Sequence, residues 1–212
     1  MKSLTRPRAR SRTSARTSAP TRAYDMSNRA AQAEATRERI RAAAVALYQE
    51  RSLDGFTLEE VAERAAVTVQ TVLRAFKSKD QLIMAALSTL ALHGQPIKEP
   101  VLGDVEGAVA VIFDLYEAIG DLVIQQLGDE LRLPGMKADM DIGRRKHADW
   151  VNTTFAPQLE IRNGTLREQI FNALMVATDV YVWKALRRDQ GLDRSTAEAV
   201  VRHIIAGIVR EV

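Results

Sequence analysis

The sequence predicts an all-α protein with two helical parts, and two observations carry that prediction. The first is a motif in which a serine or threonine is followed three residues later by glutamate or glutamine. In this capping box, the two side chains pair with backbone N–H groups that the first helical turn leaves free. Such boxes begin at Thr57, Ser78, Thr165 and Ser195. The second is that apolar residues recur at the spacing of one helix face in most of the chain.

Size and charge bound the possibilities further. The 212 residues are 46% hydrophobic and 27% charged, which is enough for one or two domains with a real core. The net charge of +3 is uneven, because residues 1–25 contain seven basic residues and one acid. The remainder is therefore mildly acidic. Local basic patches on such a body suit a protein that binds nucleic acid on one face.

We expect residues 1–27 to be a disordered basic tail, since they are rich in Arg, Ser, Thr, Ala and Pro and lack a periodic apolar face. Three explanations of this tail stay open. It resembles a basic arm that follows DNA. It also resembles an Arg- and Ser-rich transit segment. Finally, Met26 could be the translation start, because the sequence after it is a normal N-terminus.

A long first helix is predicted from about Asn28 to Gln49. Its apolar stripe consists of Ile40, Ala43, Ala44, Leu47 and Tyr48. Residues 53–55, with the sequence Leu-Asp-Gly, are predicted to end the helix.

Two short helices with a tight connection follow. The first is predicted over Leu58–Arg64, with Thr57 as its N-cap and Glu60 completing the capping box. The second begins after a Thr68 cap and runs to about residue 75, so only three residues separate the helices. This spacing is that of a helix-turn-helix, whose second helix enters a DNA major groove.

Charge favours the DNA-binding interpretation of these helices over two ordinary core helices. From residue 64 to residue 79 the chain has no acid. The basic residues of this strip are Arg64, Arg74, Lys77 and Lys79. The second helix also carries side chains able to contact base edges, namely Thr68, Gln70, Thr71 and Arg74. We therefore predict that the second helix reads DNA.

A fourth helix is predicted from Lys79 to about Leu92, opened by the Ser78 box. Gly94, Pro96 and Pro100 then interrupt the chain. These signals divide it into a DNA-binding domain over residues 28–93 and a second helical domain over residues 101–212.

Four segments of the second domain are predicted to be helical. The first runs from Asp104 to about Ala118, and a break at Gly120-Asp121 precedes a short helix that ends near Leu133. Another runs from about Met136 to Phe155. The Thr165 box is expected to start one long helix to Gln190, with Gly191 at its C′ position, and the Ser195 box to start the last helix.

Several functions lack the residues they need. The chain has no cysteine, which excludes disulfides, thiolate metal sites and a cysteine nucleophile. His93, His147 and His203 are scattered, without metal-ligand spacing. We therefore expect no enzyme activity, no cofactor and no metal. No apolar run approaches the ~18 residues of a membrane span, and no secretory signal precedes the body. The expected location is the cytoplasm.

Residues 37–87 resemble the DNA-binding domain of the tetracycline-repressor (TetR) family of regulators. The matching pieces are the Ile-x-x-Ala-Ala-x-x-Leu-Tyr pattern from Ile40, Phe-Thr-Leu-x-x-Val-Ala from Phe56, Val67-Thr68, and Phe-x-Ser-Lys-Asp-x-Leu from Phe76. The resemblance implies that the Thr57 hydroxyl and the Lys79 ammonium bind phosphate. It places Thr68, Val69, Gln70, Thr71 and Arg74 on the face that meets DNA, and Lys77 completes the candidate DNA-binding set.

The sequence departs from the family pattern at three places. Ala66 stands in the turn where the family usually has Gly, so a backbone with positive φ would be mildly strained there. Leu73, followed by Arg74, stands where a phosphate-binding Tyr is common. Gln70 replaces a small residue. Base reading specific to this protein is expected at these positions.

The resemblance also implies partners. The last two helices would pair with those of a second copy in a homodimer, and a twofold dimer would bind a near-palindromic operator. The middle helices of the second domain would enclose a pocket for a small, largely apolar inducer of unknown identity, whose binding ends repression. The candidate pocket residues are Phe113, Tyr116, Glu117, His147, Trp150, Val151, Phe171, Asn172, Met175, Thr178 and Asp179. The alternative is a ligand-independent architectural regulator, in which the same side chains are ordinary core and surface.

Overall fold

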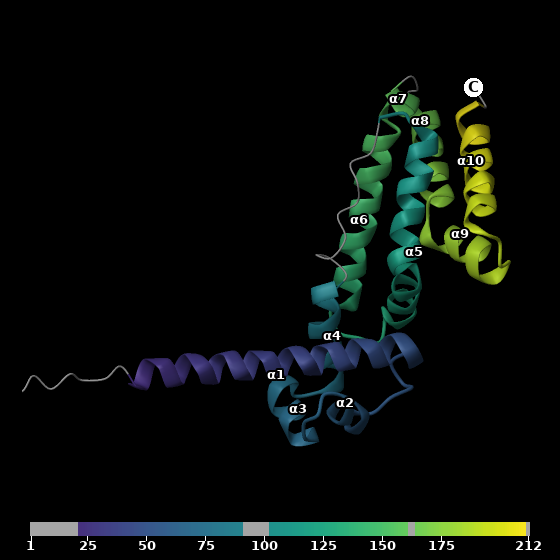
Figure 1. Ribbon diagram of the computed structural model, residues 1–212. Coiled ribbons are helices and arrows are strands. Elements are labelled where there is room, and N and C mark those ends of the chain that lie inside the picture. Colours follow the sequence, from purple (N-terminus) through teal and green to yellow (C-terminus); the bar gives the residue numbers. More distant parts are fainter. Residues whose placement is uncertain (1–20, 91–101, 161–163, 211–212) are drawn as a thin grey trace, which may run out of the picture. The chain divides into compact units, whose positions relative to one another are not determined.

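The computed structural model describes the backbone of residues 21–90, 102–160 and 164–210, where the regular structure is helical and contains no strand (Figure 1). The predicted all-α class is confirmed. None of the helices in these ranges is long and apolar enough to cross a membrane. The predicted domain boundary at Gly94–Pro100 and most of the basic tail lie outside the described residues.

The chain forms two compact units, residues 1–37 and residues 38–212, and the boundary between them lies within helix α1 (Thr21–Arg51). In the first unit, residues 21–37 form the N-terminal part of this helix. It begins seven residues before the predicted Asn28. The reason is local, because no Gly or Pro interrupts residues 21–28 and several of them are good helix formers.

In the second unit, the three helices after α1 match their predictions closely. Helix α2 spans Leu58–Arg64, α3 spans Val69–Phe76 and α4 spans Lys79–Leu90. The hydroxyl of Ser78 accepts a hydrogen bond from the Gln81 backbone N–H at 3.2 Å, as expected for the start of α4.

One hydrophobic core joins these helices to part of the second domain. Ile40, Leu47 and Tyr48 of α1 pack in it together with buried residues of α2, α3 and α4. The same core includes residues of the second domain, namely Leu122, Leu133, Met136 and Met140. Helices α1 to α4 therefore share part of their apolar interior with residues 122–140.

Helix α5 (Val105–Asp129) is continuous, so the break predicted at Gly120-Asp121 is wrong. Gly120 is buried in the middle of the helix, against the indole ring of Trp183. A Cβ atom at this position would lie 2.5 Å from Trp183 Cζ3, closer than atoms can pack. Gly120 is needed because α5 and α9 (Val180–Lys184) pack closely here. From a single sequence, a glycine required for packing cannot be distinguished from a glycine that ends a helix.

The long helix predicted from Thr165 to Gln190 is also wrong. The segment is divided into α8 (Gly164–Ala177), α9 (Val180–Lys184) and a π-helical turn, η1 (Ala185–Asp189). At the break, the Asp179 carboxylate accepts a hydrogen bond from the Tyr181 backbone N–H at 2.8 Å. Asp179 thereby starts a new helix, since a side-chain acceptor at an N-cap satisfies a free backbone donor.

Three further boundaries differ in detail. Thr165 lies inside the first turn of α8 instead of capping it. Helix α6 ends at Thr154 and is followed by a short α7 (Ala156–Glu160) that was not predicted. Helix α10 (Arg194–Arg210) is capped by Asp193, whose Oδ1 accepts from the Thr196 N–H at 3.0 Å, and not by Ser195. Gly191 has φ of +67°, as expected after a helix end.

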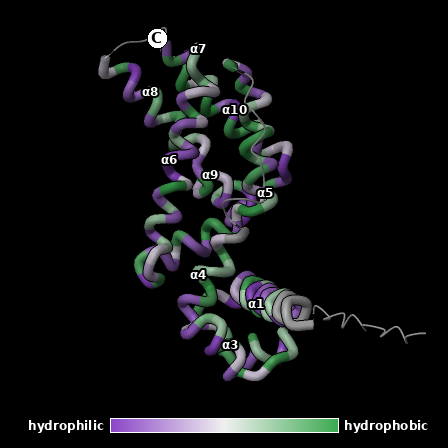
Figure 2. The backbone as a smooth tube through the Cα atoms, turned by 90° about the vertical axis from the view of Figure 1, so that its left-hand side faces the viewer, coloured by the Kyte–Doolittle hydropathy of each residue, from purple (hydrophilic) through white to green (hydrophobic). Residues whose placement is uncertain are grey.

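A second core lies among helices α5 to α10. Helix α6 spans Met136–Thr154, and α5, α6, α8 and α10 run side by side along much of their length (Figure 1). Figure 2 shows hydrophobic and hydrophilic residues alternating along each of them. The fully buried side chains at their contacts include Val109, Phe113, Val151, Leu174 and Ile205.

Candidate DNA interface and regulatory core

The first half of the helix-turn-helix is closed by local hydrogen bonds. The Thr57 hydroxyl accepts from the Glu60 backbone N–H at 3.4 Å, and the Glu60 carboxylate accepts from the Thr57 N–H at 2.8 Å. The predicted capping box is thus confirmed. Ala66 in the turn has φ of +54°, the left-handed conformation that glycine usually supplies. The expected strain at this departure is therefore present.

Helix α3 presents a polar face to solvent. Thr68 caps it and its hydroxyl lies 2.9 Å from that of Thr71, while Gln70 and Arg74 are exposed. Val72 and Phe76 are buried on the opposite side. We call Thr68, Gln70, Thr71, Arg74 and Lys77 the recognition face. Val69 and Leu73 are half-buried, so each has part of its side chain in the core and part at the surface.

The four basic residues of the predicted strip have unequal surroundings. Arg64 makes a bidentate ion pair with Glu50, with N–O distances of 2.8 and 3.1 Å. These hydrogen bonds lower the pKa of the Glu50 carboxyl. Lys79 donates to the backbone carbonyls of Leu53 and Phe56, in the loop between α1 and α2. Arg74 and Lys77 are exposed and have no ion pair with any residue that the structure describes. Of these four basic residues, the two without an ion pair or backbone partner among the described residues, Arg74 and Lys77, both lie on the recognition face.

A polar network, which we call the domain link, connects the end of α1 to the end of α5. Tyr48 is fully buried and its hydroxyl donates to Asp129 Oδ2 at 2.9 Å. Gln125 donates to the Tyr48 carbonyl. Arg132 bridges Asp129, at 3.1 Å, and Asp54, at 2.6 Å. No motif in the sequence indicated these contacts, because Tyr48 and Asp129 are 81 positions apart.

Comparison with known proteins agrees with this geometry. A profile of bacterial regulatory proteins of the tetR family matches residues 40–86, which contain the helix-turn-helix, the C-terminal part of α1 and most of α4. Residues 40–86 are therefore a DNA-binding domain of the tetR type, which supports a DNA-binding transcriptional regulator.

Two other comparisons were made with the whole chain. A transcriptional regulator from Rhodococcus sp. Rha1 has a similar fold, with a TM-score of 0.58 and 19% sequence identity. The match covers 82% of this chain and 96% of that one, so the fold likeness extends well beyond residues 40–86. No curated protein matches the sequence.

Within the core of α5 to α10, the predicted pocket residues fall into two groups. Phe113, Tyr116, Trp150 and Val151 are buried together, and Phe171 and Met175 are packed partly buried against them. The buried Thr178 joins this group at the α8–α9 break. Its carbonyl accepts from the Tyr116 hydroxyl at 3.1 Å, and burial raises the pKa of that phenol.

His147 also belongs to this first group. Its Nε2 lies 2.8 Å from the Thr178 hydroxyl, which itself donates to the Leu174 carbonyl at 2.8 Å. Because a hydroxyl has one hydrogen to donate, Nε2 must be the donor to Thr178. Burial lowers the pKa of the imidazole, so His147 is neutral near pH 7 and its Nδ1 is an acceptor.

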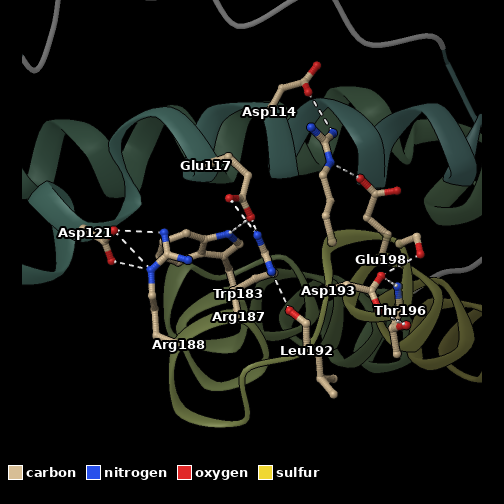
Figure 3. Close-up of polar contacts among 12 residues, drawn as sticks. Asp114, Glu117, Asp121, Trp183, Arg187, Arg188, Leu192, Asp193, Thr196 and Glu198 are labelled. Carbon is tan, nitrogen blue, oxygen red and sulfur yellow. Dashed lines mark hydrogen bonds and ion pairs between the residues drawn. The ribbon is translucent and has the colours of Figure 1, made fainter.

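The second group has other contacts. The Glu117 carboxylate accepts from Trp183 Nε1 at 3.1 Å and from Arg187 Nε at 2.5 Å, and the bond from Arg187 is the main reason that the pKa of Glu117 is lowered (Figure 3). Asp179 caps α9, and Asn172 is exposed. Figure 3 also shows Arg188 reaching Asp121, at 2.9 Å, from the same turn. These bonds hold α9 and η1 against α5.

Two buried polar atoms of α6 stand out. Trp150 Nε1 and Thr154 Oγ1 have no hydrogen-bond partner among the described residues. Residues four apart on a helix share a face, so both lie on the side of α6 that also presents His147. Buried donors are normally paired, and sequence reasoning missed Thr154 because an isolated threonine carries no signal. No cluster of three or more potential metal ligands occurs in the described ranges.

Proposed function

We propose that this regulator is a repressor that binds a pseudo-palindromic operator as a homodimer and is released by a small, largely apolar ligand. The observation that carries the DNA part is the recognition face. Its two cations, Arg74 and Lys77, are exposed and engaged in no ion pair within the described chain. An α-helix fits the major groove of DNA, and basic side chains on it that have no ion pair within the protein can bind phosphate or guanine.

Roles on the recognition face follow from side-chain chemistry. Arg74 can donate two parallel hydrogen bonds to a guanine edge, and Gln70 can pair with adenine. Thr57, Thr68 and Thr71 present exposed or half-exposed hydroxyls that can donate to phosphate oxygens. Val69, partly exposed at the start of α3, can contact a thymine methyl group.

Dimerisation through the C-terminal helices is supported by the distribution of exposed apolar side chains. Four of the six large exposed hydrophobic residues in the described ranges lie on α8, α9 and α10; these are Leu166, Val176, Tyr181 and Ile204. Such residues are costly in water and are expected at a subunit interface. A twofold axis there would place two recognition helices about 34 Å, or a multiple of it, apart on one DNA face.

Replacing Arg74 by alanine tests the DNA assignment. We expect operator affinity to fall by about 1–3 kcal/mol per half-site, with relaxed specificity at one base pair, because a bidentate base contact is lost. The measurement is a binding titration on a site selected from genomic DNA, with the stoichiometry determined in parallel. Two protomers per site are expected.

Arg145 provides the matched control. It is an exposed arginine on α6 that makes no ion pair in the described chain, so Arg145→Ala removes the same charge far from the recognition face. Equal affinities for Arg74→Ala and Arg145→Ala would show that α3 does not read the operator. One protomer per site would contradict the dimer.

A small effector is supported by the unpaired donors of α6. Trp150 lies among aromatic and aliphatic side chains and stacks on His147, and Thr154, one turn further along α6, is buried. A ligand that is mostly apolar but carries an acceptor oxygen would satisfy these donors. Since the donors are enclosed, ligand entry requires α6 to shift, and that shift provides a route to changing DNA affinity.

Trp150→Phe tests the effector proposal. The change keeps the aromatic ring and removes the indole N–H, so a ligand that releases the operator should act about three- to tenfold more weakly. Ligands would be found by screening apolar oxygen-bearing molecules for operator release. Operator affinity without ligand should not change. If no such molecule affects operator binding, the ligand-independent architectural alternative is preferred.

The domain link provides the coupling. A ligand can regulate DNA binding only if it favours one arrangement of the two domains. Tyr48, Asp54, Asp129 and Arg132 connect the corner after α5 to the loop that precedes the helix-turn-helix. By linkage, operator DNA should weaken ligand binding as much as the ligand weakens operator binding.

A further inference from the structure

The chain breaks between α8 and α9 although no glycine or proline occurs from Thr165 to Gln190. In a continuous α-helix, the Val182 backbone N–H would donate to the Thr178 carbonyl, four residues earlier. It donates to the Asp179 carbonyl instead, at 3.0 Å. The Thr178 carbonyl therefore loses its helical donor. Because Thr178 is buried, this carbonyl needs a partner from another element.

Side chains of the predicted pocket supply the hydrogen bonds at the break. The Tyr116 hydroxyl on α5 donates to the Thr178 carbonyl at 3.1 Å. His147 Nε2 on α6 donates to the Thr178 hydroxyl at 2.8 Å, and that hydroxyl donates to the Leu174 carbonyl at 2.8 Å. Trp150, whose Nε1 has no hydrogen-bond partner among the described residues, stacks on His147. The predicted pocket residues and the break are therefore in direct contact.

The break is also the point at which the chain changes its packing neighbours. Helix α8 packs mainly on α6 and α10, whereas α9 packs on α5 (Figure 1). Trp183 of α9 is buried against Gly120, and its indole N–H donates to Glu117 at 3.1 Å (Figure 3). Helix α9 is thus fixed to α5, and the bonds at Thr178 hold the end of α8 in place beside it.

The break explains why Tyr181 is exposed. Leu174 and Tyr181 are seven positions apart, so a continuous helix would place them on the same face. Leu174 is fully buried, yet Tyr181 is 57% exposed, and Trp183 is buried in its place. Val176, immediately before the break, is 65% exposed. The break therefore brings Tyr181 to the surface, and tyrosine is among the residues enriched in protein–protein interfaces.

We propose that the α8–α9 break couples the effector site to dimerisation. Tyr116 and His147 hold Thr178, and Thr178 sets the position of Tyr181 at the contact with a second copy of the chain. The inference rests on the proposed dimer and effector site. A ligand that binds among these side chains competes for the hydrogen bonds of Tyr116 and His147, so it changes the dissociation constant of the dimer. By linkage, dimerisation changes the ligand affinity by the same factor.

Tyr116→Phe tests the coupling without a ligand. It keeps the aromatic ring and removes the hydroxyl that donates to the Thr178 carbonyl. We expect the dissociation constant of the dimer to rise about three- to tenfold, because one buried hydrogen bond is lost. The measurement is sedimentation equilibrium of the full chain without DNA. Tyr48→Phe is the matched control, since it removes a buried tyrosine hydroxyl in the other core. It should leave the dissociation constant unchanged.

Tyr181→Ala tests the contact itself. Truncation of an aromatic interface residue should raise the dissociation constant of the dimer about tenfold or more. Its control is Leu131→Ala, which shortens a side chain that is 92% exposed in the turn after α5 and should have no effect. If Tyr116→Phe folds poorly, Thr178→Val removes the hydroxyl that joins His147 to α8 and should raise the dissociation constant as well.

The outcomes separate the coupling from the proposed dimer. A weaker dimer with Tyr116→Phe and Tyr181→Ala, but not with Tyr48→Phe, supports the coupling. If only Tyr181→Ala weakens the dimer, or if Tyr48→Phe weakens it as much as Tyr116→Phe, the coupling is overturned and the dimer stands. A Tyr181→Ala variant that dimerises like the wild type overturns the placement of Tyr181 and the coupling with it. A wild type that is monomeric at every concentration overturns the proposed dimer itself.

Discussion

Replacing Gly120 by alanine is expected to destabilise the protein by about 1–3 kcal/mol, although alanine is the better helix former. The added Cβ would lie 2.5 Å from Trp183 Cζ3. The indole cannot easily move, because it is buried, bonded to Glu117 at 3.1 Å and covered by Arg188 at 4.4 Å. The measurement is the free energy of unfolding in urea.

Gly128 on the same helix gives the opposite expectation. It is exposed, and a Cβ there would meet no atom within 4 Å. Gly128→Ala should therefore stabilise the protein by up to about 0.5–1 kcal/mol, because alanine loses less backbone entropy than glycine in the last turn of a helix. Opposite signs for the two substitutions would establish that Gly120 is kept for packing. A stabilised Gly120→Ala would contradict the close approach of α5 and α9.

Tyr48→Phe is expected to cost about 1.5–3 kcal/mol of stability, because the buried Asp129 loses a charge-assisted hydrogen bond. The ring remains, so the core around it keeps its volume. The effect should extend to function, since the domain link would be weakened. A ligand that releases the operator should then change operator affinity by a smaller factor than in the wild type.

A double-mutant cycle makes this expectation specific. In a double-mutant cycle, Tyr48→Phe and Asp129→Asn should show a coupling energy of roughly 0.5–3 kcal/mol, as contacting residues do. Additive effects of the two substitutions would mean that their hydrogen bond does not join the domains.

The contrast between Thr57 and Thr165 shows how far the sequence alone could predict the structure. Both begin a capping box in sequence. Thr57 caps its helix, whereas α8 already starts at Gly164. The same uncertainty applies to Gly120. A glycine predicts a break in a helix, but here α5 is continuous and Gly120 packs against Trp183. Local motifs predict where helices exist more securely than where they end.

The candidate site divides in the same way. The helix-turn-helix, its Thr57 and Thr68 caps and the strained Ala66 turn were determined by the sequence, because their hydrogen bonds join residues within about four positions. The Tyr48–Asp129 bond across 81 positions and the Lys79–Leu53 bond across 26 were decided only by the tertiary structure. A bond between distant residues depends on how helices pack, and no local pattern encodes that packing.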